Sequence, residues 1–110
     1  MYQIMKAVTY LHSKMVIHRD LKPQNILVGK KGIIKLIDFG LARRYGIPLG
    51  MYTHEVVTLS YRAPEILLGE KEYSVPVDTW ALGCIMAELY NGRPIFMDKS
   101  EIGQLYSIFK

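Results

Sequence analysis

The sequence is poor in cysteine and has no long hydrophobic run. Cys84 is the only cysteine among 110 residues, so no disulfide can form within the chain. No apolar stretch approaches the roughly 18 residues that a membrane-spanning helix requires. The first residues, MYQIMKAVTYLHSK, lack the basic start, apolar middle and small-residue cleavage site of a signal peptide. These absences favour a soluble, intracellular protein of the nucleus or cytoplasm, with Cys84 as a small buried hydrophobe.

Concentrated charge of one sign is also lacking. The net charge is +4, and adjacent basic residues occur only as the pairs Lys30-Lys31 and Arg43-Arg44. No aromatic residues alternate with them, so the pattern does not favour a nucleic-acid surface, and we expect neither nucleic acid nor membrane as a partner. A chain of this length forms one small domain that buries roughly two thirds of the surface exposed when unfolded.

Helical spacing of apolar residues is the main pattern along the chain. In residues 2–14, Ile4, Val8 and Leu11 recur on one face. A later segment, PVDTWALGCIMAELY, is apolar on nearly every face, which is typical of a helix at the centre of something larger. Ser100 is placed to cap a final amphipathic helix. Helices are therefore predicted over residues 2–14, 64–68 and 76–90, and from Ser100 onward.

The rest of the chain is predicted to be a hairpin and loops. Residues 26–28 and 33–37 are short apolar runs separated by the turn GKKG, as in a β-hairpin. Residues 18–25 form a loop interrupted by Pro23. Residues 38–62 show no convincing period, and long irregular segments inside compact domains are usually functional. The expected fold class is mainly α with a small β-hairpin.

Three polar clusters border these elements: HRDLKPQN at residues 18–25, DFG at 38–40 and APE at 63–65. Asn25 directly precedes one predicted strand and Asp38 directly follows its partner. Side chains at two adjacent strand ends can converge on one cation, and carboxylate and amide oxygens are ligands that Mg²⁺ accepts. Asp20 lies across the same loop as Asn25. Polar side chains in this number are poor material for a core and suit a loop that handles charge.

In this order and spacing, the clusters resemble the C-terminal lobe of a eukaryotic protein kinase. The resemblance implies the α+β kinase fold, with residues 1–110 as a partial domain: the first long helix, catalytic loop, magnesium loop, activation segment, central helix and start of the next helix. It also implies that the N-terminal lobe and the C-terminal end of the domain are absent. ATP and Mg²⁺ are the implied cofactors.

The resemblance assigns roles around the catalytic loop. Asp20 would be the base for the acceptor hydroxyl, Lys22 would neutralise the moving phosphate, and Thr58 would hydrogen-bond toward both. Asn25 and Asp38 would hold magnesium. The nucleotide contacts would come from Lys22, Gln24, Asn25, Leu27 and Asp38.

The stretches YTHEVVTL and YRAPEILLG narrow the likeness to the cyclin-dependent kinase group. Lysine in DLKPQN resembles serine/threonine rather than tyrosine kinases. Arg62, with Val57, would shape the pocket for proline after the acceptor, so Ser/Thr-Pro sites are the implied substrates. Phosphorylation of Thr53, beside Tyr52, would be read by Arg19, because a phosphate supplies charge and strong acceptors for an arginine. A cyclin-type subunit is the implied partner.

A supporting set of residues is implied as well. His18 and Phe39 would stack and join the two magnesium loops at Gly40, while the buried Asp78 would anchor the catalytic-loop backbone. Glu65 would lack its usual arginine partner. The other histidines, His12 and His54, match no motif and are interpreted as ordinary polar positions.

Two positions depart from the group pattern. Ser60 replaces a tryptophan, which weakens packing below the activation segment, and Gly50 replaces a basic residue that helps to hold the phosphate. Two hypotheses follow. The chain is either part of a cyclin-dependent-like serine/threonine kinase, or a truncated, catalytically silent product that at most binds partners.

Overall fold

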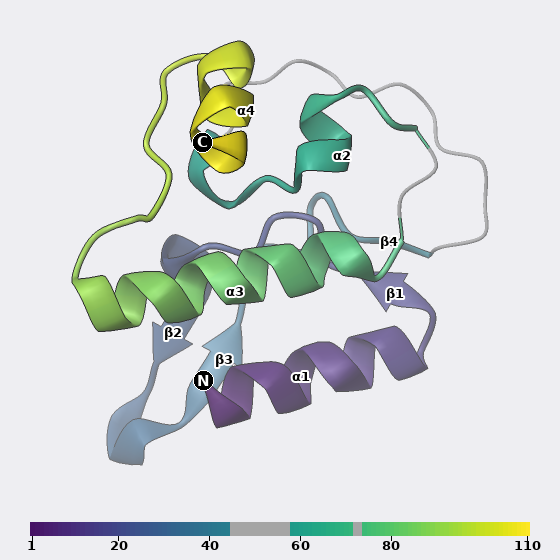
Figure 1. Ribbon diagram of the computed structural model, residues 1–110. Helices are drawn as coiled ribbons and strands as arrows, with labels where there is room; N and C mark the ends of the chain where they lie inside the picture. Colours follow the sequence, from purple (N-terminus) through teal and green to yellow (C-terminus); the bar gives the residue numbers. More distant parts are fainter. Residues whose placement is uncertain (45–57, 72–73) are drawn as a thin grey trace.

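The computed structural model describes residues 1–44, 58–71 and 74–110. Within these ranges no helix is both long and apolar enough to cross a membrane. The predicted class, mainly α with a small hairpin, is confirmed (Figure 1). The helices are α1 (Tyr2–Ser13), α2 (Pro64–Leu67), α3 (Pro76–Asn91) and α4 (Glu101–Phe109). The strands are β1 (Val16–Ile17), β2 (Ile26–Val28), β3 (Ile34–Leu36) and β4 (Arg43–Arg44). The 3₁₀ turns are η1 (Pro23–Asn25), η2 (Lys30–Gly32) and η3 (Leu59–Tyr61).

Helix α3 lies between two groups of elements (Figure 1). Helix α1 and the β2–β3 hairpin lie on one side of it, and α2 and α4 lie on the other. The observed ends of the helices agree with the sequence prediction to within one residue. Gly92 ends α3 in the left-handed conformation, at φ 74°, that glycine adopts without strain.

The hairpin forms in the predicted place. Strands β2 and β3 are antiparallel, and Ile26 faces Leu36 in the register. Gln3 on α1 fastens the hairpin because its side chain donates to the Gly32 carbonyl at 2.8 Å and accepts from the Ile34 amide at 3.0 Å. The hairpin is therefore fixed to the first turn of α1.

A second small sheet was not predicted. Strand β1 pairs antiparallel with β4, so that Val16 faces Arg44 and Ile17 faces Arg43. The prediction that residues 38–62 are irregular is therefore wrong for Arg43–Arg44, and for the 3₁₀ turn η3. Each strand is only two residues long, which is too short for an alternating pattern to be recognised in the sequence.

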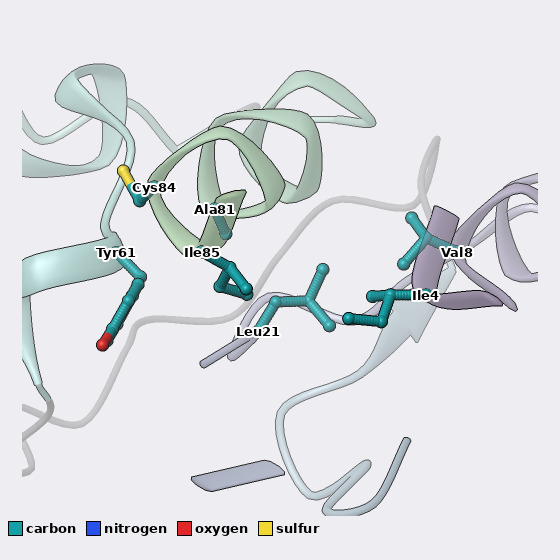
Figure 2. Packing of buried hydrophobic residues seen from close by; sticks show 7 residues of the cluster. All are labelled: Ile4, Val8, Leu21, Tyr61, Ala81, Cys84 and Ile85. Atoms are coloured by element: carbon teal, nitrogen blue, oxygen red, sulfur yellow. The ribbon is translucent and has the colours of Figure 1, made fainter. Parts of the chain in front are cut away.

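The core joins α1, the loop of residues 18–25 and α3. In Figure 2, Leu21 lies between Ile4 and Val8 of α1 on one side and Ile85 of α3 on the other. Leu21 is only 2% exposed. Burying a leucine is worth roughly 2 kcal/mol, so the residue next to Asp20 is held by hydrophobic packing.

Helix α3 buries only one of its faces against the described residues. Val77, Asp78, Ala81, Cys84 and Ile85 are buried. Three large apolar side chains further along the helix, Met86, Leu89 and Tyr90, are exposed. The apolar pattern around α3 thus matches a buried helix on one side and leaves a hydrophobic surface on the other.

Candidate active site

The catalytic loop is held by buried residues on both sides of Asp20. His18 is completely buried and Leu21 is nearly so. Asp20, which lies between them, and Lys22, which follows Leu21, are partly exposed. Asp20 and Lys22 therefore stay partly exposed while His18 and Leu21 anchor the loop in the core.

Asp78 fixes the backbone of this loop. Its Oδ2 accepts from the His18 amide at 2.9 Å and its Oδ1 accepts from the Arg19 amide at 2.8 Å. Arg19 has a positive φ of 71°, which an arginine rarely adopts, so these bonds hold an unfavourable conformation. The residues occupy the places expected for an aspartate that anchors the loop, and a carboxylate that is 1% exposed needs such donors.

His12 was interpreted wrongly from the sequence. Its Nε2 lies 2.8 Å from Oδ2 of Asp78, so it takes part in the same network instead of being an ordinary polar position. The helical spacing could have indicated this, because His12 follows Val8 by four residues and lies near the buried face of α1. No residue pattern, however, could show that Asp78 faces it.

Asp20, Lys22 and Asn25 meet in one cluster. Lys22 Nζ donates to Asp20 Oδ2 at 2.8 Å. The Asn25 amide nitrogen donates to the Asp20 carbonyl at 2.8 Å and to Asp20 Oδ2 at 3.1 Å. The Asn25 side-chain oxygen makes no hydrogen bond within the described residues. The cluster holds Asp20 in one orientation and leaves that amide oxygen for a ligand.

The loops that carry Asn25 and Asp38 are joined directly. The Ile37 amide donates to the Asn25 carbonyl at 3.0 Å, which extends the β2–β3 pairing to Asn25 and to the residue before Asp38. His18 Nε2 lies 3.1 Å from the Ile37 carbonyl, and its ring centroid is 4.9 Å from that of Phe39. His18 thus contacts both Ile37 and Phe39, but the two rings are tilted by 52° and are not stacked.

Asp38 is presented in a strained turn. It has a φ of 61°, and its Oδ1 accepts from the Gly40 amide at 3.3 Å. Its carboxylate is exposed at the end of β3, while the buried Asn25 lies just before β2. A carboxylate and an amide oxygen on adjacent strand ends are hard ligands, so the donor set fits Mg²⁺.

Two residues of the described range 58–71 border the loop that carries Asp20. Thr58 and Arg62 line a small cavity of ≈ 20 Å³ together with Asp20. Thr58 borders the same cavity as Asp20, but no hydrogen bond joins it to Asp20 or Lys22 in the residues that the structure describes. Leu27 and Gln24 are exposed on β2 and η1. Tyr52, Thr53, His54, Val57 and Gly50 lie outside the described residues.

Arg19 and Glu65 lie in different parts of the molecule. Arg19 Nε donates to the Leu41 carbonyl at 2.5 Å, which sets its side chain beside the segment that follows Asp38. Glu65 borders an apolar pocket of ≈ 710 Å³ that is also lined by Trp80 and Phe96. No hydrogen bond or ion pair reaches the Glu65 carboxylate from the residues that the structure describes.

Lys22 and Asn25 both donate to the Asp20 carboxylate, and Asp38 lies at the end of the neighbouring strand. The family model "Protein kinase domain" matches residues 1–110. The chain belongs to the protein kinase domain family. Members of this family transfer phosphoryl groups and generally use ATP and Mg²⁺.

Proposed function

We propose that the chain carries the catalytic loop of a serine/threonine protein kinase of the cyclin-dependent type, which phosphorylates Ser/Thr-Pro sites in proteins. The convergence of Asp20, Lys22 and Asn25 supports this proposal most strongly. The lysine two residues after the aspartate, in DLKPQN, supports hydroxyl acceptors on serine and threonine.

Asp20 is the group that accepts the acceptor's proton. Its carboxylate is oriented by Lys22 and Asn25, and it is partly exposed, so a substrate hydroxyl can reach it. The acceptor oxygen then forms a bond to the γ-phosphorus while the bond to the ADP oxygen breaks, and Lys22 offsets the charge of the transferred group. Magnesium, when held by Asn25 and Asp38, supplies charge neutralisation for the ATP phosphates.

Selection and regulation belong to the segment that ends at Arg62. Arg62 lies at the cavity shared with Asp20, which supports a role beside the residue that follows the acceptor. Arg19 is held next to Leu41 at the start of the same segment, which supports a phosphate-reading role toward Thr53. A cyclin-type subunit is the proposed regulatory partner.

The test uses the natural polypeptide that contains these residues, with Mg²⁺ and radiolabelled ATP. Three otherwise identical peptides are compared. The first carries Ser-Pro, the second Ser-Ala and the third Tyr-Pro. We expect transfer to Ser-Pro at least roughly tenfold faster than to Ser-Ala, the size of one good contact. Transfer only to Tyr-Pro would contradict the serine/threonine assignment, and equal rates on Ser-Pro and Ser-Ala would contradict the proline assignment.

A further inference from the structure

Gln104 is a polar residue where an amphipathic helix should place an apolar one. It is completely buried, whereas its near neighbour Ile102 on α4 is 83% exposed. A buried amide has to be hydrogen-bonded, because leaving it without partners costs about 1–3 kcal/mol. The side chain must therefore have a specific structural partner.

Both ends of the Gln104 amide are occupied. Its Nε2 donates to the Leu59 carbonyl at 3.0 Å, and its Oε1 accepts from the Asp98 amide at 3.2 Å. The Leu59 carbonyl also accepts from the Arg62 amide at 3.0 Å, which is the bond that closes η3. Both acceptor positions of this carbonyl are thus filled, one by the turn itself and one by α4.

The turn that Gln104 holds separates Thr58 from Arg62, which both border the cavity at Asp20. A second contact runs the same way, because Arg62 Nη1 lies 3.5 Å from Oε1 of Glu101, one turn before Gln104 on α4. Helix α4 therefore contacts the turn twice. The Gln104 amide binds the Leu59 carbonyl, and the Glu101 carboxylate binds Arg62. No other described side chain donates to the Leu59 carbonyl.

We propose that Gln104 is a positioning residue for substrate selection, which fixes the Leu59–Arg62 turn and thereby the place of Arg62 beside the acceptor site. This inference rests on the proposed Ser/Thr-Pro specificity. Gln104 touches no reacting atom and acts through the Leu59 carbonyl. Loss of its bond loosens the turn while the Asp20 cluster, which is held by Asp78 and Leu21, keeps its geometry.

The variant Gln104→Met keeps the length of the side chain and removes both hydrogen bonds. Ile102→Ala on the exposed face of α4 is the matched control. Hydrogen exchange of the Arg62 amide is measured in the natural polypeptide, with the Val8 amide in α1 as reference. We expect exchange at Arg62 to rise roughly three- to tenfold in Gln104→Met, the equivalent of one hydrogen bond, with Val8 unchanged.

The kinetic measurement is the ratio of kcat/KM for Ser-Pro and Ser-Ala peptides. We expect this ratio to fall by roughly threefold or more in Gln104→Met and to stay constant in Ile102→Ala. A merely structural role would lower both rates together and raise exchange at Val8 as well as at Arg62. Either that result, or unchanged exchange at Arg62, overturns the proposal.

A second variant covers the case in which Gln104→Met does not fold. Gln104→Leu is uncharged, has a similar volume and has no N–H for the Leu59 carbonyl, so the same local exchange is expected. If the natural protein does not prefer Ser-Pro, the proposed specificity fails, and the exchange at Arg62 still decides whether Gln104 holds the turn.

Discussion

Nε2 of His12 and Oδ2 of Asp78 are 2.8 Å apart, and this contact joins the last turn of α1 to the carboxylate that holds the catalytic loop. The same carboxylate accepts from the His18 and Arg19 amides. One buried side chain therefore links α1, α3 and the loop that carries Asp20.

Asp78→Leu should lower the free energy of unfolding by about 3 kcal/mol or more, because it leaves two backbone amides and a histidine without their acceptor. Urea denaturation of the variant and the parent measures the change. Thr79→Ala, on the exposed side of the same helix, is the control and should stay within about 0.5 kcal/mol. A stability for Asp78→Leu equal to that of the control would show that the carboxylate does not anchor the loop.

His12→Ala should destabilise by a smaller amount, about 1 kcal/mol, because Asp78 keeps both backbone donors. In a double-mutant cycle with Asp78→Leu, the effect of His12→Ala should disappear, since its partner is already gone. Additive losses in the two variants would mean that His12 stabilises the chain through some other contact.

The sequence indicated one support of the loop, Asp78, and missed two others, His12 and Gln104. Asp20, Asn25 and Asp38 could be recognised because their chemistry restricts residue type and spacing. His12 and Gln104 could not, because each acts through a partner far along the chain that only the fold brings near. The two-residue strands β1 and β4 likewise carry no periodicity, since pairing across the molecule decides their structure.

Phosphorylation of Thr53 stays a prediction, since this residue lies outside the described ranges. Thr53→Ala should lower the activity of the natural polypeptide, and Gly50→Arg should enlarge the gain from phosphorylation by restoring a charge-assisted contact of roughly 1.5–3 kcal/mol. Activity is compared with and without phosphate on Thr53 in both backgrounds. No effect of phosphate in either background argues against the switch, and an unchanged gain in Gly50→Arg argues against the clamp.

Cys84 should be chemically inert. Burial raises the pKa of its thiol from 9.0 to about 11, so at about pH 8 its thiolate fraction is about a hundredfold lower than that of an ordinary cysteine. Alkylation by iodoacetamide should be slower than in urea by at least that factor. Between these two pKa values only the unfolded chain loses the proton, so alkaline pH should also favour unfolding. Equal alkylation rates in the native and unfolded chains would show that the thiol is not buried.

The most direct test of the phosphoryl-transfer assignment is the rate of phosphate transfer by Asp20→Asn and Asp38→Asn in the natural polypeptide. The first change removes the base and the second a magnesium ligand, so each should lower kcat by about a hundredfold or more. Glu70→Gln, which neutralises an exposed carboxylate outside the site, is the control and should keep the parent rate. Near-parental transfer by either aspartate variant, at equal protein level, would contradict the account.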